Sequence, residues 1–398
     1  MMFTMKNSGA WLALALLMAA LLPSSSAGSL PAQTDRTWVK IGGEIYGAKP
    51  DDRGPLGGGP GYVNVARSGD FTVRTVEELA AALKQAKAGQ TVFVPGDVEL
   101  DCTDLIFVEG FHIEIPAGVT LAGDRGYKGS PGALILSDNF ATRPLVRVMG
   151  PGVRITGLRL RGPDPKRRLE HHKRSFNPAR GDDKVQHDYY YRLPMSAGVQ
   201  TESDNLEVDN CELSGWSVSA VSLAAGKSHH IHHNFIHHNQ LNGLGYGISH
   251  GAGTTISSLI ECNLFDFNRH SIAGTGAPGN SYEARNNVEL GESLSHNFDM
   301  HGGRDRKDGT DIAGDRISIH HNTFLGAAVR AVVIRGVPRE GVSVDHNWFA
   351  HERPGEKLIG PWPLTPESRV VLENNAYGLQ KPAVLDRRDS LQGGADKN

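Results

Sequence analysis

The sequence predicts an all-β protein of the right-handed parallel β-helix class, a solenoid that begins with a short N-terminal capping helix. The main observations are two ladders, in which an asparagine and a glycine each recur at a spacing near two dozen residues. A repeat of this length indicates stacked units, each of which buries its apolar face only against its neighbours. The composition agrees, since 48 glycines and only 7% aromatic residues among 398 favour many short strands joined by turns.

The first ladder consists of short alternating strand patterns that end in an asparagine, with an apolar residue within the next three places. Successive asparagines are 24, 29, 24, 35, 25 and 28 residues apart, which corresponds to one coil, with longer gaps where a loop is inserted. A stacked asparagine can hydrogen-bond to its copies above and below, and it tolerates the left-handed turn that bends one strand into the next. The members of this ladder are Asn210, Asn234, Asn263, Asn287, Asn322, Asn347 and Asn375.

The second ladder consists of strand patterns that close on a glycine, at successive distances of 25, 25, 26 and 34 residues. Two ladders with one shared period indicate one repeating coil. A leucine-rich solenoid is the alternative, but its LxxLxL pattern is approached only once, at 155–160, and does not recur. The glycines are Gly226, Gly251, Gly276, Gly302 and Gly336.

The first residues, 1–27, have the pattern of a secretory signal peptide. Lys6 supplies a small positive charge, an apolar run covers 11–22, and small residues lead to Ala27. Twelve apolar residues are too few for a helix to cross a membrane, and no later run is long enough. We therefore expect cleavage near Ala27 and a secreted or periplasmic protein without a membrane span.

The remaining chain divides into three parts. Residues 28–69 form a Gly/Pro-rich N-terminal segment, in which no regular element is expected over 42–61. Residues 70–380 form the solenoid, and a polar tail follows. Long loops on a rigid solenoid are where function concentrates. The solenoid carries two such inserted loops, at 163–194 and 303–315, and the tail covers 381–398.

A short helix is predicted at the start of the solenoid, over residues 76–88. Its apolar residues recur at helical spacing, Thr75 and Glu78 suit a capping box, and Gly89 suits its end. A strand pattern, TVFVP, follows at once. An amphipathic helix that leads directly into a strand suits a cap over the apolar end of a stack.

The charge and the cysteines exclude several classes. With 41 basic and 44 acidic residues, the chain lacks the excess of positive charge that a nucleic-acid binder needs. Cys102, Cys211 and Cys262 match no zinc pattern, and we interpret them as small buried residues. We expect a monomer that has no nucleic-acid partner.

Eighteen histidines raise the question of a metal site, mainly in HHIHHNFIHHNQ (229–240) and IHHN (319–322). Most lie beside ladder asparagines, at turn positions that other coils fill with residues unable to bind metal. Adjacent histidines on a strand also point to opposite faces, so they cannot all converge. We interpret these histidines as structural or surface residues, with metal binding as the alternative.

A different set of polar residues follows the glycine ladder. In LSHNFDMHGG (294–303), alternation directs Phe298 and Met300 into the core and the residues between them outward. The outer face then carries Asp299 and His301, and the neighbouring coils add Tyr246, His250 and Arg335. The basic loop that begins with Arg304 and Arg306 lies beside this column, and the first insertion offers Tyr190 and Arg192 as its far wall. Sugar rings stack on aromatic side chains, and uronate carboxylates pair with arginine.

The asparagine ladder, the segment VRTVEELAAALKQAKAGQTVFVPG and the export signal together resemble the pectate-lyase-like superfamily of right-handed parallel β-helices. The resemblance covers roughly residues 70–380. It implies the fold and a carbohydrate polymer as the ligand, but the superfamily includes polysaccharide lyases, glycoside hydrolases, uronan epimerases and phage tailspikes. No family motif marks the catalytic residues, so the assignments rest on their position alone.

The leading interpretation is a polysaccharide lyase that acts on an acidic, uronate-containing glycan. Such a reaction needs a base near C5, a cation that neutralises the carboxylate, and a proton donor for the leaving oxygen. The candidates are His301 or His250 as base, Tyr246 as donor, and Arg304, Arg306 or Arg335 as neutraliser, while Asp299 orients His301 or binds calcium. The alternatives are a hydrolase or epimerase that uses Asp299 with a second aspartate, and a non-catalytic glycan binder or adhesin.

Overall fold

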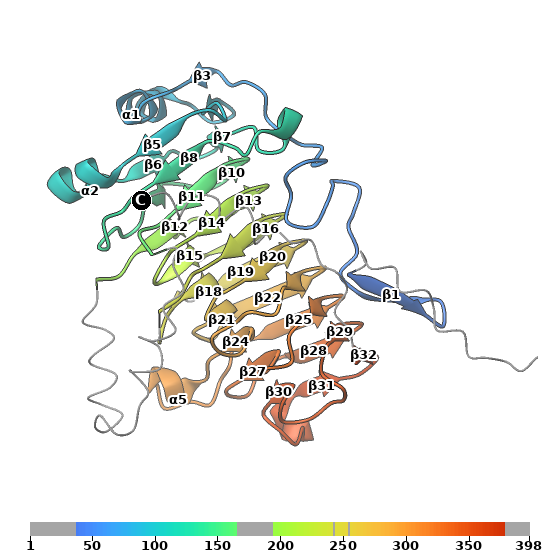
Figure 1. The fold of residues 1–398 in the computed structure, drawn as a ribbon. Coiled ribbons are helices and arrows are strands. Elements are labelled where there is room, and N and C mark those ends of the chain that lie inside the picture. The colour runs from blue at the N-terminus through green and yellow to red at the C-terminus, as the bar shows by residue number, and fades with distance from the viewer. Residues whose placement is uncertain (1–36, 165–193, 242, 254, 379–398) are drawn as a thin grey trace, which may run out of the picture.

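A computed structural model describes residues 37–164, 194–241, 243–253 and 255–378. The chain is mostly β, with three long sheets of parallel strands and few helices (Figure 1). The predicted signal peptide, the polar tail and most of the first inserted loop, with Tyr190 and Arg192, lie outside the described residues. In the described ranges, no helix has both the length and the apolar character to cross a membrane.

The first sheet has 11 strands, and the other two have 10 and 9. The first contains β3 (Phe71–Thr72), β4 (Thr91–Phe93), β7 (Thr120–Ala122), β10 (Arg154–Thr156), β13 (Glu207–Asp209), β16 (Gly226–His232), β19 (Ile256–Glu261), β22 (Asn280–Arg285), β25 (Arg316–His320), β28 (Gly341–Asp345) and β31 (Val370–Leu372). The second contains β5 (Glu99–Asp101), β8 (Leu134–Leu136), β11 (Arg159–Arg161), β14 (Glu212–Ser214), β17 (Phe235–His237), β20 (Leu264–Asp266), β23 (Val288–Glu289), β26 (Thr323–Phe324), β29 (Trp348–Phe349) and β32 (Ala376–Tyr377). The third contains β6 (Ile113–Ile115), β9 (Val146–Val148), β12 (Ala197–Thr201), β15 (Ser219–Leu223), β18 (Tyr246–His250), β21 (His270–Gly274), β24 (Phe298–Met300), β27 (Val332–Ile334) and β30 (Ile359–Gly360).

The order of the strands explains the period of the sequence. From β4 to β30 the chain visits the first, second and third sheets in turn, so every third strand pairs in parallel with the one before it. Each coil therefore adds one strand to each sheet, which agrees with the repeat that the two ladders predict. The handedness of the coil stays a prediction from the sequence.

The asparagine ladder joins the first sheet to the second, and its predicted stacking is confirmed. From Asn234 to Asn375, each side-chain Nδ2 donates to Oδ1 of the asparagine one coil further on, at 2.9–3.0 Å. The same Oδ1 also accepts a bond from the backbone N–H of the preceding asparagine, at 2.9–3.1 Å. Each of these amides therefore fixes the position of the coil above it.

Two details of the predicted ladder are wrong. The left-handed backbone conformation belongs to the residue before each asparagine, such as His233 (φ 53°) and His321 (φ 55°), because the asparagine itself must extend its amide toward the next coil. Asn210 is one such turn residue (φ 52°), and Cys211 takes the ladder position below Asn234. The side chain of Asn210 instead accepts a bond from the backbone of Gly59 at 2.8 Å.

The predicted cap helix is present as α1 (Val76–Gln85), three residues shorter than expected. Thr75 Oγ1 accepts a bond from the backbone of Glu78, and Leu79 and Leu83 join the core. In Figure 1, α1 lies beside β3 at the N-terminal end of the stack. Further helical turns that the sequence did not indicate are α2 (Thr103–Glu109), α5 (Gly303–Arg306), η1 (Tyr127–Gly129) and η3 (Pro366–Ser368).

The Gly/Pro-rich N-terminal segment is more regular than expected, since β1 (Trp38–Ile41) and β2 (Glu44–Gly47) form an antiparallel pair. The chain then crosses the edge where the first and second sheets meet. We call residues 48–63 the strap. Its backbone bonds to Thr323 Oγ1 and to the carbonyl of Cys262, and it ends where Tyr62 donates to Asp209 at 2.8 Å. The strap therefore ties several successive coils together.

One charged residue lies inside the stack of aromatic side chains. In the second sheet, Glu289 occupies the position that Phe265, Phe324 and Phe349 fill in neighbouring coils, and it is 4% exposed. Burial raises the pKa of Glu289 to about 8, although Ser271 donates to its Oε2 at 3.0 Å. The side chain is therefore held protonated at neutral pH.

We predict that Asn287→Ala lowers the free energy of unfolding by about 1–2 kcal/mol, because it leaves buried donors and acceptors of two neighbouring coils without partners. Asn375→Ala is the control, since this last asparagine has a ladder partner on one side only. Urea unfolding followed by circular dichroism measures both variants. Equal losses in the two variants would contradict a cooperative ladder.

We predict that Glu289→Gln stabilises the protein, and more so as the pH rises from 5 to 8. The folded pKa lies above the unfolded value of about 4.3, so unfolding releases a proton, and the wild type loses about 1.4 kcal/mol of stability per pH unit in this window. A neutral amide has no such loss. Urea unfolding at pH 5 and pH 8 tests this, with the exposed Glu352→Gln as the control. A gain that does not depend on pH would show that Glu289 is ionised in the fold.

Candidate functional site

The candidate site lies on the outer side of the third sheet, around Asp299 in the middle of β24. Phe298 and Met300 point into the core, so Asp299 and the following His301 take the opposite direction. The Asp299 side chain is nevertheless 0% exposed, because its neighbours cover it. Arg335, from the next coil, donates two hydrogen bonds to it, Nε to Oδ1 at 3.1 Å and Nη2 to Oδ2 at 2.9 Å.

Three histidines surround the same carboxylate. Asp299 Oδ2 lies 2.9 Å from His301 Nε2, 3.2 Å from His296 Nε2 and 3.8 Å from His270 Nε2. The rings of His270 and His296 are stacked, with centroids 3.9 Å apart, and His270 Nδ1 bonds to the carbonyl of His296 at 2.6 Å. The ring of Tyr246 continues this stack, 5.8 Å from His270 and nearly parallel to it. Four successive coils thus contribute side chains to one cluster.

The charges in this cluster are set by burial and by hydrogen bonds. Burial by itself raises the pKa of Asp299, but hydrogen bonds from His296 and His301 outweigh it and hold the pKa well below its usual range. Burial lowers the pKa of His296, and it lowers that of His270 far below the ordinary value. At neutral pH the cluster therefore contains an ionised aspartate, a paired guanidinium and two neutral buried imidazoles.

The loop 303–315 folds beside the cluster and begins with α5. Asp305 Oδ2 lies 3.8 Å from both His301 Nδ1 and Arg335 Nη1. Arg306 is turned into the loop, where it donates to Asp308 and to the carbonyl oxygens of Thr275 and Ile312. Its guanidinium therefore fixes the loop, which does not suit the substrate-binding role predicted for it. Arg304 is 84% exposed and lies 3.5 Å from Asp311.

The structure brings together only some of the residues that the sequence singled out. Asp299, His301 and Arg335 are in direct contact, Tyr246 flanks them, and Arg304 lies on the adjoining loop. Tyr190 and Arg192 lie outside the described residues. The roles assigned to all of these residues stay predictions.

His250 does not share this face, which corrects the predicted column. It pairs in register with Gly274, and through it with the core residue Met300, so it points into the interior and is 1% exposed. Its Nε2 lies 2.8 Å from Ser258 Oγ, across the inside of the stack. The error arose because Gly251 follows its strand one position earlier than Gly276 and Gly302 follow theirs, and a shift of one residue reverses the face.

Sequence reasoning missed His270 and His296. The available signal was their separation of 26 residues, one period of the ladder, together with the pairing of His270 to Tyr246 one coil earlier. Both histidines precede the alternating part of their strands, where a simple inside–outside rule assigns no face. A search for chemically similar residues one period apart would have found them.

The same groups can be tested as a metal site. His270, His296 and Asp299 each offer one ligand atom, and these atoms lie within 4.8 Å of one another. Two nitrogens and one oxygen do not suit calcium, which takes six to eight oxygen ligands. They resemble a zinc donor set, but Arg335 already places a positive charge against Asp299 and lies 3.2 Å from His296 Nε2. The arrangement therefore fits an organic anion or a neutral sugar better than a cation.

Comparisons with known proteins place few constraints on this site. No protein-family model and no curated protein matches the chain. Among solved structures, the chain is similar to an alginate lyase from Paenibacillus sp. str. FPU-7, with 14% sequence identity and a TM-score of 0.37, over 79% of this chain and 98% of that chain. A likeness at this level does not assign the chain to a family.

Proposed function

We propose that this protein is a polysaccharide lyase that cleaves an acidic, uronate-containing glycan by β-elimination. The observation that carries the proposal is the contact of one buried carboxylate, Asp299, with both His301 and Arg335. The same anion holds a base and a cation side by side. A base and a cation at neighbouring positions are what proton abstraction beside a substrate carboxylate needs.

His301 is the proposed base. Its Nε2 faces the ionised Asp299, so the neutral ring donates Nε2–H to the carboxylate and keeps its lone pair on Nδ1. The side chain is 25% exposed, whereas the other two histidines of the cluster are 14% and 0% exposed. His301 is therefore the imidazole that a polymer at the surface reaches most easily.

In the proposed reaction, His301 Nδ1 takes the proton from C5 of the uronate. The C5–H electron pair forms the C4–C5 double bond, and the bond from C4 to the linking oxygen breaks. Arg335 Nη1, with the exposed Arg304 beside it, neutralises the substrate carboxylate as charge develops. The leaving oxygen takes a proton, and Tyr246 stays the candidate donor.

The geometry disfavours the hydrolase alternative. A glycosidase needs two carboxyl groups that face the glycosidic bond, one of which protonates or attacks it. Asp299 is fully buried, and Arg335 and His301 occupy its oxygens, so it cannot take part directly. An epimerase would use the same base at C5 but would return the proton, so its product has no double bond.

We also propose that the protein acts outside the cytoplasm, on the pattern of residues 1–27. A glycan polymer is found outside the cell, so export suits the proposed substrate. N-terminal sequencing of the protein recovered from the medium or periplasm tests this part. An intact N-terminus in that fraction would contradict cleavage near Ala27.

We predict that the wild type, screened on alginate, pectate, glucuronan, ulvan and glycosaminoglycans, releases unsaturated products that absorb in the near ultraviolet. On the polymer that it cleaves, His301→Ala should lower the rate by about a hundredfold or more, because a general base is lost. The melting temperature should change by no more than about 2 °C, because the side chain lies at the surface.

His320→Ala is the matched control, since His320 also contacts a carboxylate, at 3.2 Å, but on the first sheet. It should keep most of its activity. Full activity in His301→Ala would move the base elsewhere. New reducing ends without the double bond would favour a hydrolase, and binding without any product would favour a non-catalytic glycan binder.

A further inference from the structure

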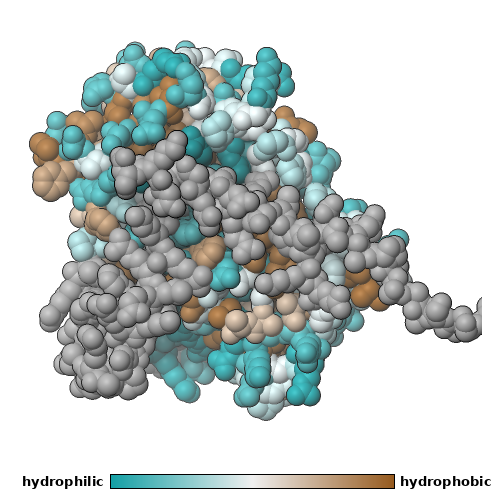
Figure 2. Space-filling model, viewed as in Figure 1, coloured by the Kyte–Doolittle hydropathy of each residue, from teal (hydrophilic) through white to brown (hydrophobic). Residues whose placement is uncertain are grey.

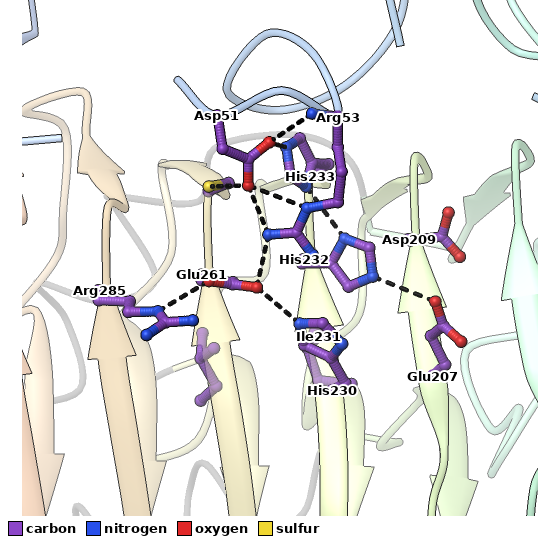
Figure 3. Close-up of polar contacts among 12 residues, drawn as sticks. Asp51, Arg53, Glu207, Asp209, His230, Ile231, His232, His233, Glu261 and Arg285 are labelled. Atoms are coloured by element: carbon purple, nitrogen blue, oxygen red, sulfur yellow. Dashed lines mark hydrogen bonds and ion pairs between the residues drawn. The ribbon is translucent and has the colours of Figure 1, made fainter. Parts of the chain in front are cut away.

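A second polar cluster lies on the outer face of the first sheet, under the strap (Figure 3). His230 and His232 are two residues apart on β16, so both point outward from the sheet, with ring centroids 4.0 Å apart. Glu207 lies on the neighbouring strand β13, in register with His230. One ligand atom from each of these three side chains lies within 4.8 Å of the others.

A chain of hydrogen bonds fixes where the protons of this cluster are. Asp51, in the strap, accepts bonds from Arg53 and is therefore an ionised acceptor. Since His233 Nε2 lies 3.1 Å from Asp51 Oδ1, that nitrogen carries the hydrogen and His233 Nδ1 is bare. His232 Nδ1 lies 3.0 Å from this bare nitrogen, so it must be the donor.

The consequence is an unmatched contact at the other end of the His232 ring. A neutral His232 that carries its hydrogen on Nδ1 has a lone pair on Nε2. That nitrogen lies 3.2 Å from Glu207 Oε1, so two acceptors face each other in a position where His232 is only 3% exposed. Something positive must lie between them, either a proton or a metal ion.

We propose that Glu207, His230 and His232 bind a divalent transition-metal ion of the zinc class. Zinc takes imidazole nitrogens and carboxylate oxygens, and an open site keeps three protein ligands and one water. The side chains of His230 and Glu207 are 30% and 39% exposed, which leaves solvent access for the ion and for a water ligand. The Asp51–His233 chain is the outer-shell support that orients a ligating histidine.

The surrounding charges are compatible with an added cation. The carboxylates of Glu207, Asp209, Glu261 and Asp51 stand against the guanidinium groups of Arg53, Arg154 and Arg285, which leaves one net negative charge with the histidines neutral. Glu261 now lies 2.8 Å from His230 Nε2. It keeps Arg53 and Arg285 as partners when His230 turns to a metal, so no buried carboxylate is left unpaired.

Two other groups among the described residues have metal-ligand spacing, and both fit less well. In the group of Asp51, His233 and Cys262, Arg53 occupies the carboxylate and burial raises the pKa of the Cys262 thiol, which opposes the thiolate form that metals bind. In the group around Asp299, Arg335 occupies the carboxylate. The carboxylate of Glu207 has only a distant arginine, with Arg154 Nε at 3.5 Å.

The stack contains its own matched control. Three coils further on, His320 repeats the geometry of His232, with Nδ1 2.9 Å from His321 Nδ1 and Nε2 3.2 Å from Glu283 Oε1. The position that corresponds to His230 is Ser318 in that coil. The second copy therefore has two potential ligands where the first has three, and we expect it to bind metal far more weakly.

The test is a zinc titration of the metal-free full chain, in competition with a chromogenic chelator. We expect one tight site per chain in the wild type and in His320→Ala. His230→Ala and Glu207→Gln remove a direct ligand at partly exposed positions, so the fold should survive. Each should weaken zinc binding by at least the roughly 10- to 100-fold that the loss of an outer-shell partner causes. Cobalt in place of zinc should give the visible absorption of a four-coordinate ion.

Several outcomes would overturn the proposal. The absence of a tight site in the wild type would mean that a proton bridges His232 and Glu207. Unchanged affinity in both His230→Ala and Glu207→Gln, with loss in His296→Ala, would place the metal at Asp299 instead. An equal loss in His320→Ala would mean that any His–Glu contact on this sheet suffices.

Discussion

The structure depends on the hydrogen bond that the side chain of one ladder asparagine donates to the next. Each amide accepts from the coil before it and donates to the coil after it, so it fixes the register between the first and second sheets as well as the spacing of the coils. A shift of one residue would reverse every outward side chain of a strand. The contacts of Asp299 with Arg335 and of His232 with Glu207 both join neighbouring coils, so both exist only in the register that the ladder sets.

The sequence was most informative where a chemical type repeats with the coil. Buried asparagines at 24 to 35 residues are a strong signal, because an interior amide needs partners and only an equivalent residue one coil away supplies them. The same reasoning found Asp299, His301 and Arg335 before the coordinates were known. It failed for His250 because the glycine ladder is looser, and a closing glycine can follow its strand at different distances.

The paired histidines illustrate a second limit of sequence reasoning. In each HHN segment the two rings have different surroundings, since the first points out from the first sheet and the second lies in the left-handed turn before the ladder asparagine. The sequence suggested opposite faces, but it could not show that the second ring bonds back to the first. That bond determines which nitrogen of the outward ring faces the acid on the preceding coil, and hence whether the pair can hold a cation.

The two polar clusters lie on different sheets of the same coils, and the misplaced His250 lies between them. From the third sheet, it reaches across the interior to Ser258 of the first sheet at 2.8 Å, and its ring packs against Tyr282, with centroids 5.6 Å apart. Burial lowers the pKa of His250 to about 3, so this link is neutral and does not change over the physiological pH range. An uncharged, fully buried link cannot pass a charge from one cluster to the other, but it can hold the two sheets at a constant separation. The interior of the stack therefore keeps both clusters in place while leaving the chemistry of each one independent.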